Sequence, residues 1–359
     1  RLCRGCAGSS RSGRRHAEMT ASRDDTVNVP LADVRQTAYA ALVRAGCDHE
    51  NADATAGVMA AADGDGCASH GIFRLAGYLA TLKSGKVDGK ARPVSRRLAP
   101  SVVQIDGRRG LAPLAMHAAR EALVPVAREQ GIAAAALVNV HHFSALWVDI
   151  EALVKAGLAA MSFTAYMPAV APAGARTPFF GTNPMAFGWP RTQGRTLIFD
   201  QASAAMARGE IMIASRDGHA VPPGAGLDAE GNPTTDPTKI LKGAQLAFGG
   251  YKGSSIAMMV ELLAAGLIGQ PFSYEAGAED NRDGGPPRGG VLVIAMDPGK
   301  FGDAEGWREH AERFLLELSG LGDVRLPGDR RAANRARIAK EGVRLPAKLW
   351  NDALNSAKA

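Results

Sequence analysis

The stretch SVVQIDGRRGLAPLAMHAAREALVPVAREQGIAAAALVNV, residues 101–140, decides the fold class. Its first six residues predict a strand that ends at an Asp-Gly turn signal. The following residues have strong amphipathic helical spacing and stop at Gly131, which predicts a helix. The apolar run 132–140 then predicts a buried strand. A strand, a helix and a second strand in succession predict an α/β protein.

The same alternation continues on the C-terminal side. We expect helices at 145–156, 252–268 and 305–319, and strands at 158–166, 185–189, 196–200 and 290–296. A Pro/Gly-rich loop runs from Met167 to Pro184, and such long loops are usually functional. Segment 276–289 is predicted to be a polar surface loop, and the basic segment 324–359 to begin with a loop. On the N-terminal side, helices are expected at 30–46, 51–63 and 72–84.

Composition and charge narrow the function classes. The 359 residues are enough for two domains, or for one large core with an appended lobe. The net charge is +6, but residues 1–18 supply +4 of it, which leaves little argument for a nucleic-acid surface. The apolar stretches are interrupted, as by Glu261, and fall short of the ~20 residues that a membrane span needs. The four scattered cysteines are typical of a reducing compartment, so a cytoplasmic location is expected.

The N-terminal tail, residues 1–26, shows no period that predicts folding. It is rich in Arg and Ser and has no apolar core, so it is not a secretory signal. An organelle transit segment is one interpretation. The simpler one, which we favour, is that Met19 is the natural start and that the tail is disordered or non-native. Cys3 and Cys6 have no second pair to complete a zinc site.

Phosphate-binding motifs are the next question. The sequence contains no G-x-G-x-x-G between a strand and a helix, and no G-x-x-x-x-G-K-[ST]. If the protein binds a nucleotide, it therefore uses another geometry. Segment 248–266, FGGYKGSSIAMMVELLAAG, is the nearest substitute, because its glycines allow close backbone approach and Lys252 lies at the start of the predicted helix.

The segment ASHGIFRLAGYL, residues 68–79, carries the first chemical constellation. Ser69 is placed where a hydroxyl would cap the helix expected from residue 72. His70 and Arg74 are four residues apart, which on a helix puts both on one face. A histidine that donates a proton and an arginine that binds a carboxylate suit an α-keto or α-imino acid. A helix start disfavours imidazolium, so a proton-donating His70 would need an anion behind it.

Three further segments predict binding chemistry. VNVHHFSALW, residues 138–147, joins a strand to a helix, and Ser144 with free amides at the helix start suits a phosphate. Its two histidines suggest metal, yet adjacent side chains point apart and no third ligand has the right spacing. The GTNP turn offers Thr182, and the stretch DQASAAMARGE, residues 200–210, offers Glu210 as the anion behind His70. Segment 325–337 is dense in arginine, which suits a solvated face or the extra phosphate of NADPH.

Six motifs of the sequence together resemble one family. ASHGIFRLAGYL, PAVAPAGA, GTNPMAFGWPR, LDAEGNPTTDP, FGGYKGSSIAMMVELL and RLPGDRR, in that order, resemble the malate/L-lactate dehydrogenase superfamily, which is the non-Rossmann group of NAD(P)-dependent oxidoreductases. The resemblance covers about residues 27 to 350. HHFSALW, TAYMPAVAPAG and DQASAAMARGE look most similar to the Δ1-piperideine-2-carboxylate/Δ1-pyrroline-2-carboxylate reductases within it.

The resemblance implies an architecture. A helical domain is expected from residues 27–100 with 323–359 returning to it, and an NADP-binding and substrate sheet domain from residues 101–322. A homodimer is also implied. This non-Rossmann fold agrees with the missing G-x-G-x-x-G motif.

The resemblance also implies roles for individual residues. Ser69 and Glu210 would form a relay with His70 as the proton donor, and substrate would be held by Arg74, Thr182, Arg208 and Gly209. NADPH would be bound by His142, Phe143, Ser144, Ala145, Leu146, Asp200, Gln201, Ala202, Lys252, Arg325, Leu326, Pro327, Gly328, Asp329, Arg330 and Arg331. No metal is expected.

The resulting expectation is an NADPH-dependent imine reductase. It would convert the small cyclic imino acids Δ1-piperideine-2-carboxylate and Δ1-pyrroline-2-carboxylate to L-pipecolate and L-proline, with hydride added to the C=N carbon. Three alternatives stay open: an NAD(P)-dependent dehydrogenase of a 2-hydroxy acid of the malate, lactate or ureidoglycolate type, a metal-dependent hydrolase that uses His141 and His142, and a non-catalytic binding protein. The bulky HHFSALW, where hydroxy-acid members show a glycine-rich run, weighs against the first of these.

Overall fold

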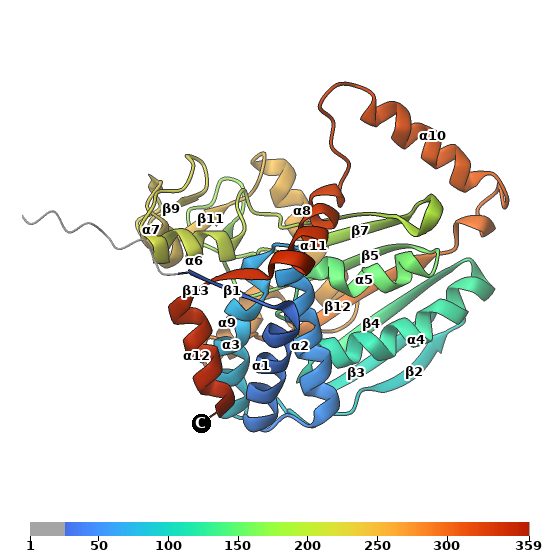
Figure 1. Cartoon of the computed structure of the whole chain (residues 1–359). Helices are drawn as coiled ribbons and strands as arrows, with labels where there is room; N and C mark the ends of the chain where they lie inside the picture. Colours follow the sequence, from blue (N-terminus) through green and yellow to red (C-terminus); the bar gives the residue numbers. More distant parts are fainter. Residues whose placement is uncertain (1–25, 359) are drawn as a thin grey trace, which may run out of the picture.

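The central element is a mixed seven-stranded sheet, seen in a computed structural model that describes residues 26–358 (Figure 1). Its strand order is β2 (Val94–Ala99), β3 (Val102–Leu111), β4 (Ile132–His141), β12 (Arg288–Met296), β5 (Ala159–Thr164), β7 (Met185–Pro190) and β8 (Thr196–Gln201). Only β3 and β4 pair in parallel within this sheet, and its other neighbours are antiparallel. The expected α/β, non-Rossmann class is therefore confirmed.

The strand–helix–strand unit that predicted the class is present. Helix α4 (Ala112–Gln130) crosses from β3 to β4 and ends at Gly131, whose φ of 83° lies in the left-handed region. The first strand, however, does not end at the Asp-Gly turn. It continues to Leu111 through a bulge between Asp106 and Gly110, where Arg108 and Arg109 also have positive φ. The Asp-Gly pair lies in a bulge within the strand and not in a turn that ends it, so the strand predicted from the sequence is too short.

Two helices cover one face of the sheet. Helix α4 and helix α5 (Leu146–Lys155) pack side chains between themselves and the strands. The apolar run of β4 is buried because it lies at the centre of this layer, where Leu137, Ile150 and Leu153 are fully buried. This cluster fixes the C-terminal end of β4, from which the 141–146 segment leaves the sheet.

The two ends of the described chain pack together. Helices α1 (Leu31–Arg44), α2 (His49–Gly64) and α3 (Leu75–Lys83) share one apolar cluster with α11 (Asp329–Glu341), β13 (Val343–Pro346) and α12 (Ala347–Lys358). Strand β1 (Thr26–Val29) pairs antiparallel with β13. Figure 1 shows these blue and red segments side by side. The predicted tail lies outside the described residues, except that Thr26 begins β1.

The remaining elements form smaller units. A second sheet has the order β10 (Pro233–Thr234), β9 (Gly226–Leu227), β11 (Ala244–Leu246) and β6 (Val170–Ala171), beside α6 (Arg208–Asp217) and α7 (Pro237–Lys242). Helix α8 (Tyr251–Glu261) continues into a π-helical turn, Leu262–Gly266. Short 3₁₀ turns occupy Ala68–His70, Ile72–Arg74, Thr192–Gly194 and Pro298–Lys300. Helix α10 (Trp307–Ser319) extends away from the body in Figure 1.

Two predicted loops are partly wrong. Segment 276–289 begins inside helix α9 (Ser273–Glu279), and its Gly285, Pro286 and Pro287 are buried rather than at the surface. The segment that follows Val324 becomes helical at Asp329, so Arg330 and Arg331 lie in the first turn of α11. Among residues 26–358, no helix combines the length and the apolar character that crossing a membrane requires.

Candidate active site

The segment around His70 is more irregular than its sequence predicted. His70 ends one 3₁₀ turn and Arg74 ends the next, so the two do not share an α-helical face. Gly71 breaks the helix with a ψ of −146°, and Oδ2 of Asp63 accepts a hydrogen bond from the amide of Ile72 at 2.7 Å. Ser69 is consequently not a helix cap, because α3 starts only at Leu75.

Ser69 and His70 nevertheless form a direct pair. The Ser69 hydroxyl lies 3.0 Å from Nδ1 of His70, and the Cys67 sulfur lies 3.8 Å from the same nitrogen. Burial, with smaller contributions from Arg74 and His142, lowers the pKa of His70 to about 3. The imidazole is therefore neutral at physiological pH. The group behind it is a hydroxyl and not the anion that was expected.

Arg74 lies close to this pair. Its Nε donates to the Ser69 carbonyl at 2.7 Å, and its guanidinium lies 4.3 Å from the centroid of the Phe143 ring. Burial lowers the pKa of Arg74 and of Arg208. The nearby Tyr166 side chain raises both pKa values and so partly offsets the effect of burial. Within residues 26–358, neither guanidinium is paired with a carboxylate. Two partly desolvated cations thus have donors available for an anion.

Helix α6 touches the pair through a glycine. A Cβ at Gly209 would lie 2.7 Å from Cβ of Ser69 and 3.2 Å from Nη2 of Arg74, so only glycine fits there without displacement. Glu210, the next residue, is exposed and makes no side-chain hydrogen bond with another residue of the described chain. The structure therefore brings Gly209 to Ser69 but does not join Glu210 to the Ser69–His70 pair.

Thr182 is placed by a buried polar network. The amide group of Asn183 donates to Glu261 at 2.8 Å, and Ser203 donates to the carbonyl of Asn183 at 2.7 Å. The carbonyl of Thr182 accepts from the Ser203 amide at 2.8 Å. This network explains why a glutamate interrupts an otherwise apolar helix. It joins the GTNP turn to the DQAS segment.

The segment 142–146 departs from its expected phosphate geometry. Oδ2 of Asp200 accepts hydrogen bonds from the amides of Leu146 at 3.0 Å and Trp147 at 3.2 Å, so the α5 amides that were predicted to be free already have an anion. Burial raises the pKa of Asp200 to about 6. His142 bonds Asp149 at 2.7 Å, and Ser144 lies 3.3 Å from the same histidine nitrogen.

The arginine-rich segment 325–331 lies against this region. Arg331 donates to the Ile198 carbonyl, and its guanidinium lies 5.0 Å from the centroid of a Trp147 ring. Leu326 is buried, whereas Arg325 and Arg330 are exposed. The structure thus brings segment 325–331 together with Asp200 and segment 142–146, while Gln201 and Ala202 follow at the end of β8.

Lys252 lies in the first turn of α8. The amide of Phe248 donates to the Ser203 carbonyl at 3.1 Å, which places the start of α8 beside the DQAS segment. The Lys252 side chain itself is exposed, and no hydrogen bond joins it to another described residue. Its assignment to the cofactor site stays a prediction.

Aromatic residues that were not assigned to substrate complete the surroundings of Arg74. The Phe143 ring stacks on Tyr166 with centroids 6.3 Å apart and meets Tyr78 edge-on at 5.6 Å. Sequence reasoning missed Tyr166 as a site residue and placed Phe143 with the cofactor. The available signal was an aromatic residue at the end of a buried strand, immediately before the long Pro/Gly-rich loop.

The two adjacent histidines have separate partners. Nδ1 of His141 lies 3.1 Å from the Pro286 carbonyl, whereas His142 pairs with Asp149. No group of three or more His, Cys, Asp or Glu side chains suited to a metal ion lies among the residues that the structure describes.

Comparison with known proteins agrees with this architecture. The malate/L-lactate dehydrogenase family model matches residues 29–353. A Δ1-pyrroline-2-carboxylate reductase of Ancylobacter novellus is 47% identical over 330 residues, which cover 91% of this chain and 96% of that relative. The solved Δ1-piperideine-2-carboxylate reductase of Pseudomonas syringae pv. tomato has a TM-score of 0.87 and 42% identity, and the match covers 92% of this chain and 99% of that one. An NADP-dependent (2R)-3-sulfolactate dehydrogenase of Chromohalobacter salexigens is 41% identical, over 89% of this chain and 94% of that relative.

These matches define the class of enzyme as a nicotinamide-dependent oxidoreductase. The chain belongs to the malate/L-lactate dehydrogenase family, as its six ordered motifs predicted.

Proposed function

We propose that this enzyme reduces Δ1-pyrroline-2-carboxylate and Δ1-piperideine-2-carboxylate to L-proline and L-pipecolate with NADPH. The similarity to reductases named for these substrates supports the proposal over most of the chain. The structural observation that carries it is the pair formed by neutral His70 and Arg74, which no carboxylate of residues 26–358 neutralises; Ser69 bonds both residues, and Phe143 lies beside Arg74. A small apolar ring with one carboxylate and one basic nitrogen matches these groups.

Arg74 and Arg208 would bind the substrate carboxylate. Burial lowers the pKa of both guanidiniums, because each has lost contact with water. An anion bound between them would offset their mutual repulsion and replace part of the solvation that each has lost. The planar fork of arginine allows two parallel hydrogen bonds to a carboxylate and therefore fixes its orientation. Phe143 and Tyr166 would then contact the apolar ring.

His70 would deliver the proton to the ring nitrogen. Because its pKa is about 3, it donates as a neutral imidazole, with the proton on Nε2 and Nδ1 accepting from the Ser69 hydroxyl at 3.0 Å. Transfer of the Ser69 proton to Nδ1, as Nε2 gives up its own, would leave the imidazole neutral, and a proton taken up from solvent would restore the Ser69 hydroxyl. This route supplies the proton without requiring a buried imidazolium.

The cofactor assignment rests on the chemistry of the residues around Trp147. Arg325 and Arg330 are exposed cations beside a segment that Leu326 and Arg331 fix in place, which suits the phosphates of NADPH. His142, Ser144 and Asp200 would lie nearby. When bound, the reduced nicotinamide supplies the hydride for the imine carbon. Preference for NADPH over NADH follows if the exposed arginines bind the 2′-phosphate.

Steady-state absorbance assays test the function. NADPH oxidation should be fast with either cyclic imine and slow with pyruvate, oxaloacetate or 3-sulfopyruvate; the similarity to a sulfolactate dehydrogenase makes the last of these the relevant competitor. A higher kcat/KM for any open-chain 2-keto acid would replace the proposal with the 2-hydroxy-acid dehydrogenase. Equal kcat/KM values with NADH and NADPH would remove the cofactor preference. Ser69 would act in the proton relay and Thr182 would contact the substrate, as predicted. Glu210 is left out of the proposed relay, because its exposed side chain makes no hydrogen bond with Ser69 or His70.

The architecture of the enzyme in solution is also proposed. Residues 27–100 with 323–359 would form the helical domain and residues 101–322 the sheet domain. We propose a homodimer located in the cytoplasm.

A further inference from the structure

A cleft of about 600 Å³ lies outside the candidate active site. It is formed where the β3 bulge, the end of β4, the turn after α3 and the α9–β12 connection meet. None of the residues lining it belongs to the sets assigned above to catalysis, substrate or cofactor. The cleft is open on one side and bordered by charged side chains of both signs, namely Lys86, Arg108, Arg109 and Arg288 with Asp106, Glu279 and Asp280.

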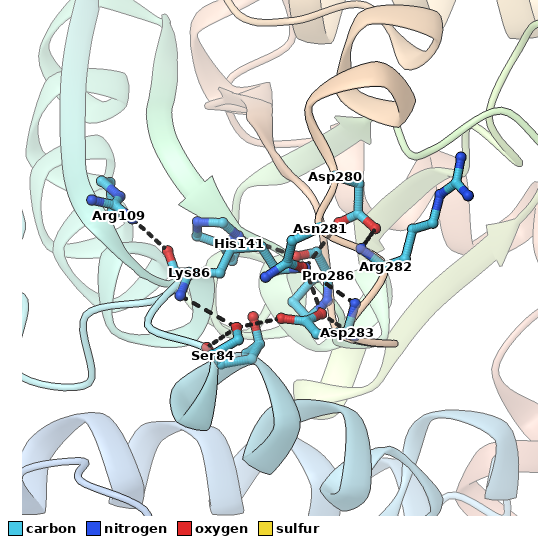
Figure 2. Close-up of polar contacts among 11 residues, drawn as sticks. Ser84, Lys86, Arg109, His141, Asp280, Asn281, Arg282, Asp283 and Pro286 are labelled. Carbon is cyan, nitrogen blue, oxygen red and sulfur yellow. Dashed lines mark hydrogen bonds and ion pairs between the residues drawn. The ribbon is translucent and has the colours of Figure 1, made fainter.

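Ion pairs make the walls of this cleft rigid. Lys86 bonds Asp280 at 2.9 Å and Asp283 at 2.7 Å, and the Ser84 hydroxyl donates to Asp283 at 2.6 Å (Figure 2). Arg288 pairs with Glu279 at 2.8 Å. These bonds fasten the α9–β12 connection to the end of α3. The charges they leave in the cleft nearly balance.

Two groups in the cleft retain unused hydrogen-bonding capacity. Arg109 donates only to the carbonyls of Gly85 at 3.3 Å and Lys86 at 3.1 Å, and no carboxylate of the described chain pairs with it. His141 is 1% exposed, and its Nδ1 must donate to the Pro286 carbonyl, since a carbonyl oxygen only accepts. Its Nε2 is buried and has no partner among the described residues. Burial, aided by Lys86, Arg109 and Arg288, lowers the pKa of His141 to about 4, so this nitrogen is an acceptor that lacks a donor.

The backbone that presents these groups is strained. Arg108, Arg109 and Asn139 have φ values of 53°, 63° and 53°, a region that residues with a side chain adopt rarely. The bulge between Asp106 and Gly110 directs Arg109 toward the turn at Lys86. Such outliers persist where the surrounding structure holds them, and they gather at ligand sites. Three of them border one cleft here.

We propose that this cleft binds a free α-amino acid in its zwitterionic form. Arg109 offers donors for the carboxylate, while Glu279 and Asp280 offer acceptors for the ammonium group. A phosphate or another multiply charged anion suits the cleft less well, because three carboxylates line it. The nearly balanced charge favours a ligand that carries one charge of each sign.

Binding should be measured on the full-length protein in which Arg74→Lys weakens the active-site carboxylate contact. A thermal-shift screen of the common L-amino acids, with inorganic phosphate as the simple-anion probe, selects the ligand, and calorimetry then measures its Kd. Arg109→Gln and Glu279→Gln, each added to this background, should weaken that ligand at least about tenfold, which corresponds to one charged hydrogen bond. Arg313→Gln, an exposed arginine on α10, is the matched control and should leave Kd unchanged.

The two variants protect the test against misfolding. Arg109 also donates to two carbonyls, whereas Glu279 is exposed and, among the described residues, pairs only with Arg288, so Glu279→Gln should melt near the control temperature. The proposal is overturned if no amino acid binds, if binding persists in both variants, or if phosphate binds in an Arg109-dependent way and amino acids do not. None of these outcomes depends on which substrate the enzyme reduces, because the active-site contact is weakened throughout.

Discussion

The contact between Gly209 and Ser69 gives the sharpest test of the candidate site. In Gly209→Ala, the new Cβ would lie 2.7 Å from Cβ of Ser69 and 3.2 Å from Nη2 of Arg74. Carbon atoms pack at ~3.5–4.0 Å, so Ser69 and the start of α6 must separate by about 1 Å. Overpacking of this kind costs ~1–3 kcal/mol of stability. In the proposed mechanism the displaced residues carry the proton relay and the carboxylate contact, and a shift of about 1 Å in a catalytic group costs ~10²-fold in rate.

Two measurements separate the local effect from general damage. The melting temperature reports the packing cost, and kcat/KM for Δ1-pyrroline-2-carboxylate with NADPH reports the position of Ser69 and Arg74. Gly57→Ala is the matched control, because Gly57 lies inside α2 and a Cβ there meets nothing within 4 Å. This control should gain up to about 1 kcal/mol of stability and keep its activity. If Gly209→Ala keeps kcat/KM within about twofold of wild type, the Ser69–Arg74 arrangement does not carry the chemistry.

Three other substitutions test individual groups. His70→Ala should lower kcat by ~10²–10⁴-fold while NADPH still binds, as measured by fluorescence titration, and retention of more than half of kcat would assign the proton to another group. Arg74→Lys keeps the charge but loses the planar fork and the contact with Phe143, so KM should rise about ten- to a hundredfold, and an unchanged KM would place the substrate carboxylate elsewhere. Burial raises the pKa of Asp63 from its ordinary 3.8 to about 7, so the folded protein retains a proton there that the unfolded chain releases, and stability falls as pH rises between these values. Relative to Asp63→Asn, the wild-type free energy of unfolding should therefore decrease by up to about 4 kcal/mol from pH 4 to pH 8, and a pH-independent difference between the two would contradict the buried, protonated carboxyl.

The regular elements could be predicted because their signals are local. The helical spacing of 113–130, with its glycine stop, matches α4, and the apolar run 132–140 matches β4 within a residue. The missing phosphate fingerprint agrees with a sheet in which only β3 and β4 run parallel. The ordered motifs then placed the chain in its family.

The errors arose where a long-range contact overrides a local signal. The side chain of Asp63 accepts a hydrogen bond from the amide of Ile72, and this contact prevents the continuous helix that the sequence after Ser69 suggests. Asp200 accepts hydrogen bonds from the α5 amides that were expected to be free, although it lies more than fifty residues from them in the chain. Tyr166 gains its significance only because Phe143 and Arg74 come from other segments. No periodicity or propensity encodes such pairings.

The arrangement of charge at the site explains why these contacts matter for function. Two half-buried arginines that no carboxylate of residues 26–358 pairs with are costly, because each has lost solvation and Arg208 repels Arg74. The fold offsets this cost with contacts that carry no negative charge, namely the Ser69 carbonyl and the faces of Phe143 and Phe73 at Arg74, and the Gln245 side chain at Arg208. A carboxylate in their place would neutralise the site and exclude an anionic substrate. In the proposed mechanism the ligand supplies this anion, so the binding energy of the substrate carboxylate would be available to orient its C=N bond toward His70.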